Sequence, residues 1–277
     1  MAQSLNDGDD FWERTGGDHS QMEQRPLVEA SELAGLGPIR LLYVPAADEK
    51  IEGLRTVPIA DWVRHALKSR SGLDDDAYWL EAFTRLGLGP DALTVVIDDG
   101  RMTEAARVWF MLQYFGLPTA VLNGGVDALD MSPQQAPEYT GQLVLVPGSG
   151  SVGLRDRNTL KDELDRVQIF DARTQAEYRG EDLKGNSRGG HLPGARNLSH
   201  ADLLDGTRLK QAATIARMLD ETGLDGDEPI VSHCNGGGRA ALAALAAIVS
   251  GRSSVSVYYL SFADWAADES CPIHRQL

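Results

Sequence analysis

Cysteine is scarce in this sequence, with two residues among 277. Two cysteines cannot build the disulfide framework of a small secreted domain, so we expect reduced thiols and a cytoplasmic protein. The N-terminal residues have neither the basic nor the apolar region of a secretory signal peptide. The chain also lacks any apolar run approaching the roughly 20 residues that span a bilayer, so no membrane partner is expected.

Basic side chains are also few. The 26 Lys and Arg residues face 41 Asp and Glu residues, which gives a formal net charge of -15. A chain this acidic should repel nucleic acids and anionic membranes, because both require a positive surface. A small anionic substrate would therefore need a local cationic or N–H-lined site. We expect no nucleic-acid partner, and a monomer.

Hydrophobic residues make up 42% of the chain, enough for two packed domains. Short apolar runs alternate with amphipathic segments, and this order occurs twice with an offset of roughly 130–137 residues, as expected for repeated α/β units. Such alternation predicts parallel sheets with helices on both faces. The predicted strands are 39–44, 94–98, 119–122, 167–170, 230–233 and 254–259. The predicted helices are 58–70, 76–87, 105–112, 159–166, 175–179, 208–223 and 240–250.

The domain organisation follows from this duplication. Residues 1–25 are polar and acidic and predict a flexible tail. The first domain is expected over 26–140 and the second over 159–277. Residues 141–158, which include Pro147-Gly-Ser-Gly-Ser151, are expected to form a linker.

Cys234 stands between the predicted strand 230–233 and the alanine-rich helix 240–250. It is followed by a polar and glycine-rich loop that ends in arginine: Asn235, Gly236, Gly237, Gly238 and Arg239. The glycines permit backbone turns with φ > 0, which would direct N–H groups inward at the start of a helix. Such a site stabilises an anion, and here it favours the reactive thiolate. Arg239 could hold the loop by pairing with a carboxylate, or it could face an anionic substrate.

Two further segments lie upstream. Asp171 and Arg173 follow the predicted strand 167–170, at the sheet edge where ligands bind in open parallel sheets. The segment Gly190-His191-Leu-Pro-Gly194 predicts a rigid loop. Together with Cys234-x-x-x-x-Arg239, these motifs resemble the rhodanese (thiosulfate sulfurtransferase) superfamily in order and spacing, over about residues 160–273.

The resemblance implies an α/β protein of two tandem rhodanese-like domains, and a sulfurtransferase without metal or cofactor. It implies that Cys234 carries a persulfide, fed by a small anionic donor and emptied by cyanide, a thiol or a protein thiol. Residues 235–239 would form the active-site loop, with support from Asp171, Arg173, His191 and Arg107. The first half resembles the degenerate partner domain of tandem members. There, Asp98 and Asp99 stand where the cysteine would be, and Arg107 is expected either at the interdomain cleft or in a structural pair.

The donor stays open at this point. Asn235 and Gly236 provide neither the basic side chains of animal-type thiosulfate members of the family nor the hydroxyl of mercaptopyruvate members. Glu177 stands where both of those groups have an arginine that anchors the substrate, which argues against mercaptopyruvate in particular. The pattern of Glu177, Tyr178 and a loop-closing arginine resembles bacterial thiosulfate-type members and favours thiosulfate. The alternatives are 3-mercaptopyruvate as the donor, or a persulfide carrier without small-molecule turnover. A phosphatase or arsenate reductase would need five residues between cysteine and arginine, whereas this chain has four.

Overall fold

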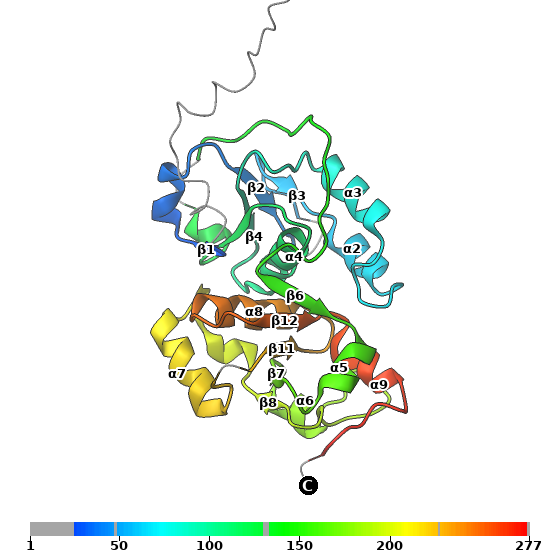
Figure 1. Cartoon of the computed structure of the whole chain (residues 1–277). Helices are drawn as coiled ribbons and strands as arrows, with labels where there is room; N and C mark the ends of the chain where they lie inside the picture. Colours follow the sequence, from blue (N-terminus) through cyan, green and yellow to red (C-terminus); the bar gives the residue numbers. More distant parts are fainter. Residues whose placement is uncertain (1–24, 47–48, 130–132, 227, 276–277) are drawn as a thin grey trace, which may run out of the picture.

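The computed structural model describes residues 25–46, 49–129, 133–226 and 228–275. These residues form two sheet-bearing α/β domains, one above the other in Figure 1. The first sheet is entirely parallel and has the strand order β1-β5-β4-β2-β3. Its strands are β1 (Leu27–Val28), β2 (Arg40–Tyr43), β3 (Arg55–Thr56), β4 (Thr94–Ile97) and β5 (Thr119–Leu122).

The second sheet repeats this topology. It is also parallel, with the order β6-β12-β11-β7-β8. Its strands are β6 (Val152–Arg155), β7 (Gln168–Asp171), β8 (Arg196–Asn197), β11 (Ile230–His233) and β12 (Val255–Tyr258). The central strands β4 and β11 are buried along their whole length, as expected for parallel strands covered on both faces. The predicted architecture, two α/β domains that each contain a parallel sheet, is confirmed.

Local sequence signals mark several of the helix ends. Asp75 caps α3 and Asp156 caps α5 through their side chains, and Gly223 ends α7 with φ 81°. The α-helices are α2 (Ile59–Ala66), α3 (Asp76–Arg85), α4 (Thr103–Tyr114), α5 (Arg157–Glu163), α6 (Gln175–Arg179), α7 (Ala212–Thr222), α8 (Gly238–Val249) and α9 (Ser261–Ala267). The 3-10 helices are η2 (Ala30–Gly35), η3 (Val126–Ala128) and η4 (His200–Leu203). None of the helices within the described residues combines the length and the apolar character that crossing a bilayer requires.

Helices α4 and α8 pack against each other between the two domains (Figure 1). Each follows the central strand of its sheet, and each is buried along most of its length. A helix that is apolar on all sides is typical of a position between two layers. As a result, one apolar core runs through α4 and α8 from the first domain into the second. This interface places the start of α4 beside the start of α8.

Two sequence predictions differ from the structure. The predicted linker 141–158 contains β6 and the first residues of α5, and β6 pairs with β12 at the edge of the second sheet. The predicted helix 208–223 begins at Ala212, because residues 208–209 form β10 (Arg208–Leu209) in a hairpin with β9 (Leu204–Asp205). The predicted tail, 1–25, lies outside the described residues except for Arg25.

Candidate active site

Cys234 lies between the end of β11 and the start of α8. The Gly237 N–H donates to its Sγ at 3.1 Å, and Ser261 Oγ lies 3.8 Å from the same sulfur. The cysteine is 1% exposed, and its own N–H donates to Ser261 Oγ at 3.1 Å. The Ser261 hydroxyl donates to the Tyr258 carbonyl at 2.9 Å, so the N–H of Gly237 is the donor that the sulfur meets, at a helix N-terminus where negative charge is stabilised.

The three glycines of the Cys234 loop (residues 234–239) differ in whether the structure leaves room for a side chain. Only Gly237 has a positive φ, 98°, so the prediction of left-handed turns is wrong for Gly236 and Gly238. A Cβ on Gly238 would lie 2.8 Å from Arg107 Nη2 and 2.9 Å from Glu104 Oε1, so close packing against α4 excludes a side chain. A Cβ on Gly236 would meet nothing within 4 Å.

Arg239 holds the loop through a bidentate ion pair with Glu177 on α6. Its two Nη atoms lie 2.7 and 2.8 Å from the carboxylate oxygens, and the Glu177 side chain is 1% exposed. Burial would raise the pKa of Glu177, but the Arg239 guanidinium lowers it to about 2. Burial likewise opposes the charge on Arg239, while Glu177 and the Cys234 sulfur raise its pKa. Of the two roles that the sequence left open for Arg239, the carboxylate pair is the one observed.

The outer side of the loop is held by the start of α9 and by an asparagine pair. Phe262 N–H donates to the Cys234 carbonyl at 3.0 Å, and Asn186 Nδ2 donates to Asn235 Oδ1 at 2.7 Å. Ser261 has φ 62° and is fully buried, a conformation that non-glycine residues rarely adopt. Such local strain persists only where the surroundings fix it, and it is common at functional sites.

Asp171 and Arg173 form a buried pair at the end of β7. Arg173 Nη2 lies 2.6 Å from Asp171 Oδ2 and also donates to the Gly190 carbonyl at 2.8 Å. The guanidinium stacks on Phe262, 3.8 Å from the ring centroid. Burial would raise the pKa of Asp171, but His233 and Arg173 lower it. The pair thus contacts Phe262 of α9 and the Gly190 loop. Among the bonds of the described residues, neither side chain contacts the Cys234 sulfur.

The chain is similar to known proteins both in its second domain and over most of its length. Residues 156–268 match the family model described as a rhodanese-like domain. A thiosulfate sulfurtransferase from Azotobacter vinelandii is 32% identical over 212 residues, which cover 73% of this chain and 77% of the relative. The chain belongs to the rhodanese family of sulfurtransferases. A 3-mercaptopyruvate sulfurtransferase from Escherichia coli strain K12 is 28% identical over 202 residues, covering 69% and 71% of the two chains.

A solved structure also matches across nearly the whole rhodanese chain. It is described as the sulfur transferase subunit of yeast mitochondrial complex I, with a TM-score of 0.74 and 17% identity. The match covers 90% of this chain and 99% of that one, and it shows the shared fold. The predicted family is confirmed, and the protein is a sulfurtransferase. Thiosulfate and 3-mercaptopyruvate sulfurtransferases are both similar to it, so the similarity does not distinguish between these two sulfur donors.

Of the other predicted site residues, His191 does not contact the Cys234 loop and Arg107 does. His191 contacts Tyr178 rather than Cys234: its Nδ1 lies 3.0 Å from the Tyr178 carbonyl oxygen, and the two rings stack at 3.8 Å. Its backbone pairs with His274, so this residue joins the 190–194 loop to the C-terminal segment. Arg107, by contrast, reaches from the first domain to the Gly236 carbonyl at 2.7 Å.

Sequence reasoning missed Ser261, Tyr259 and Asn186 as neighbours of the loop. Ser261 and Tyr259 follow β12 directly. The rule that ligands gather at the carboxyl ends of parallel strands could have indicated both. Asn186 comes from a loop with no pattern of its own, and only its bond to Asn235 identifies it.

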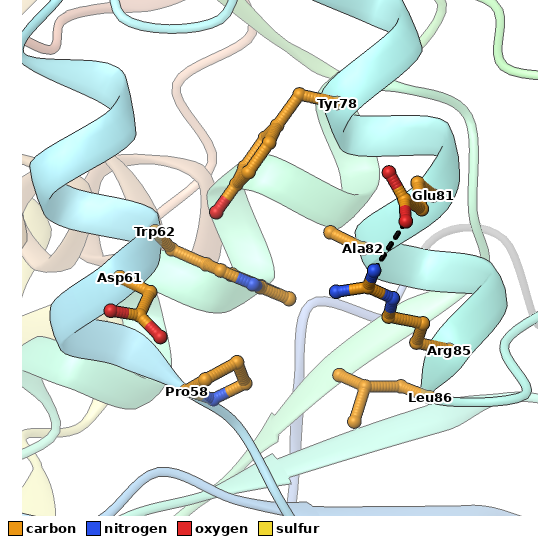
Figure 2. A pocket seen from close by; sticks show the side chains of 8 residues that line it. All are labelled: Pro58, Asp61, Trp62, Tyr78, Glu81, Ala82, Arg85 and Leu86. Carbon is orange, nitrogen blue, oxygen red and sulfur yellow. Dashed lines mark hydrogen bonds and ion pairs between the residues drawn. The ribbon is translucent and has the colours of Figure 1, made fainter.

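The first domain of this rhodanese has a small cavity of about 110 Å³ between α2 and α3. Figure 2 shows Tyr78 and Trp62 on one side of it and the Glu81–Arg85 ion pair on the other. The cavity belongs to the domain that lacks Cys234, so it is separate from the candidate active site. Within the described ranges, no group of three His, Cys, Asp or Glu side chains is arranged to hold a metal ion.

Proposed function

We propose that this rhodanese is a thiosulfate sulfurtransferase that carries the transferred sulfur as a persulfide on Cys234. The observation that carries the proposal is the Gly237 N–H, which points at the Cys234 sulfur from 3.1 Å at the start of α8. A hydrogen-bond donor in this position stabilises the Cys234 thiolate before the reaction and the persulfide anion after it.

The reaction has two displacement steps. The Cys234 thiolate attacks the outer sulfur of thiosulfate, the S–S bond of the donor breaks, and its electron pair leaves with sulfite. A nucleophilic acceptor, cyanide or a thiolate, then attacks the outer sulfur of the persulfide. The bond to Sγ breaks, its electron pair returns to Cys234, and the acceptor leaves as thiocyanate or as a new persulfide. This is covalent catalysis with ping-pong kinetics.

The polar groups of the site favour thiosulfate over mercaptopyruvate. Both Nη atoms of Arg239 are bound to Glu177, so this fork is not free for a substrate carboxylate. Sulfite leaves as a stable anion, whereas the carbon leaving group of mercaptopyruvate needs a proton. Asn235 and Gly236 carry no acidic proton. Burial lowers the pKa of the adjacent His233 to about 4, so this imidazole is neutral at pH 7 and has no imidazolium proton to give to the leaving group.

Intact-mass spectrometry tests the proposal. The protein is incubated with thiosulfate, and separately with 3-mercaptopyruvate, under non-reducing conditions. We expect a gain of one sulfur atom with thiosulfate, its loss on adding cyanide, and no gain in Cys234→Ser. Cys271→Ser is the matched control, because this second thiol is also buried and should leave loading unchanged.

Three results would decide against this proposal. Loading of Cys234→Ser would remove the cysteine from the mechanism. Loading by 3-mercaptopyruvate with a higher kcat/KM than by thiosulfate would reverse the assigned donor. Loading by thiosulfate without turnover by cyanide or small thiols would identify a persulfide carrier.

A further inference from the structure

One peptide group links the two domains to the reactive sulfur. The peptide between Gly236 and Gly237 has its N–H directed at Cys234 Sγ, at 3.1 Å. Its carbonyl oxygen accepts a bond from Arg107 Nη1 at 2.7 Å. Since the peptide is planar, the bond at its oxygen also fixes the direction of its N–H.

We propose that Arg107 of the first domain is a positioning residue for the sulfur-transfer reaction, acting on Cys234 through this single peptide. The inference rests on the proposed role of Cys234. Arg107 fixes the plane of the peptide, and its charge polarises the carbonyl so that the N–H becomes a stronger donor. The domain without a reactive cysteine thus contributes to the anion site of the other.

The guanidinium of Arg107 is itself held in place. Its Nε and Nη2 bind the two oxygens of Glu104 at 2.8 and 3.1 Å, and Nη1 also donates to the Tyr259 hydroxyl at 3.0 Å. The residue is 8% exposed. Every guanidinium nitrogen therefore has at least one partner, which fixes the guanidinium in front of the Gly236 carbonyl.

The packing leaves the peptide little freedom. A Cβ on Gly237 would lie 2.9 Å from Tyr259 Cε2 and from the Tyr259 carbonyl oxygen, and 3.1 Å from Arg107 Nη1. Tyr259 and Arg107 thus enclose the peptide from the β12 side and from α4. Removing the Arg107 fork would open one of these two walls and release the carbonyl.

Other charged or titratable groups lie near Cys234, and they are the same in the parent protein and in variants of Arg107. Arg239 on α8 is attracted to Cys234 but is paired with Glu177 on α6. His233 precedes Cys234 on β11, with its Nε2 3.5 Å from Asp171, and Tyr259 follows β12. None of these groups contacts the Gly236 carbonyl among the bonds of the described residues, whereas Arg107 does.

The test measures how fast iodoacetamide alkylates Cys234 at neutral pH, in a Cys271→Ser background and with Cys234→Ser as the blank. Arg107→Gln should slow the alkylation about tenfold, because the reactive thiolate would lose the oriented N–H of Gly237. Arg107→Lys keeps the charge but cannot bind Glu104, Gly236 and Tyr259 together, so it should slow the alkylation less. The sulfane-sulfur lifetime of the loaded enzyme should shorten in the same order.

Gln113→Ala is the matched control. Gln113 lies on the same helix, is buried, and also binds the other domain, through the backbone of Val152 at 2.9 and 3.0 Å. It should lower stability without changing the alkylation rate of Cys234. An Arg107→Gln rate equal to that of the parent, or an equal loss of rate in Gln113→Ala, would overturn the inference. Failure of the parent protein to load sulfur would instead contradict the proposed function, because the alkylation requires no sulfur donor.

Discussion

Alanine substitutions at the three glycines of the Cys234 loop test the packing between the domains. The chemistry of the change is the same at each position, but the surroundings differ. At Gly237 the new Cβ would meet Tyr259 and Arg107 at 2.9 to 3.1 Å, in a backbone conformation with φ 98°. At Gly238 it would meet Arg107, Glu104 and the Thr103 carbonyl at 2.8 to 3.2 Å, without a positive φ.

The expected costs follow from these contacts. A backbone with φ 98° and ψ -42° is sparsely populated by L-residues and costs them about 1–3 kcal/mol, and overpacking costs about 1–3 kcal/mol. Gly237→Ala combines both costs and should lower the free energy of unfolding by about 2–6 kcal/mol. Gly238→Ala has only the packing term of about 1–3 kcal/mol. Gly236→Ala meets nothing within 4 Å and should stay within about 0.5 kcal/mol of the parent.

Denaturant unfolding at neutral pH measures all three variants, with sulfur loading as a second readout. Gly237→Ala should also lose loading, because the displaced peptide carries the N–H that faces the sulfur. A stability loss in Gly236→Ala as large as that in Gly237→Ala would refute this reasoning. Full stability in Gly238→Ala would show that α4 does not press on the loop.

Two further predictions concern the ion pairs. Glu177→Gln should cost about 2–4 kcal/mol in urea unfolding at pH 7, because it leaves the largely buried Arg239 without its carboxylate. The native pKa of about 2 lies below the ordinary 4.5, so this stabilisation is complete above pH 4.5 and is lost as the pH falls towards 2; a difference between parent and variant that stays constant over this range would contradict the assignment. Arg173→Gln should cost about 3–5 kcal/mol by leaving the buried Asp171 carboxylate without its guanidinium partner. Arg101→Gln, which removes an exposed pair of the same spacing, should cost less than about 1 kcal/mol by the same unfolding assay, and equal losses in these two variants would show that burial does not set the cost.

Most of the fold could be predicted from the sequence because local patterns determine it. The runs at 94–98 and 230–233 are apolar and β-branched, and both became central strands. Strand β6 was missed because only Val152 of its four residues is buried, and Gly153 weakens the pattern. Its pairing with β12, a partner distant in the sequence, makes it a strand. The hairpin at 204–209 was missed because each of its strands has only two residues, too few to show an alternating pattern.

The site was predictable where its residues adjoin one strand end, and not where the domain interface supplies them. The sequence indicates Cys234 and Arg239 because strand, glycine loop and helix are continuous. It predicts a carboxylate partner for Arg239 as one option, and Glu177 is that partner. The bond from Arg107 to Gly236 joins residues 129 positions apart in the sequence. Only the packing of α4 on α8 brings these two residues together.

The two domains treat the same position in opposite ways. Asp98 directly follows β4 as Cys234 directly follows β11, and its carboxylate accepts the N–H groups of Gly100, Met102 and Ala105 at 2.9 to 3.1 Å. Asp98 and Cys234 thus each place a hydrogen-bond acceptor at the start of an interface helix, α4 and α8 respectively, where negative charge is stabilised. In the first domain three N–H groups surround the Asp98 side chain, which offsets part of the rise in its pKa that burial causes. In the second domain the Cys234 sulfur accepts one N–H, from Gly237, among the bonds of the described residues. The sulfur thus depends on a single peptide for its N–H donor, and that peptide is the one whose carbonyl Arg107 binds.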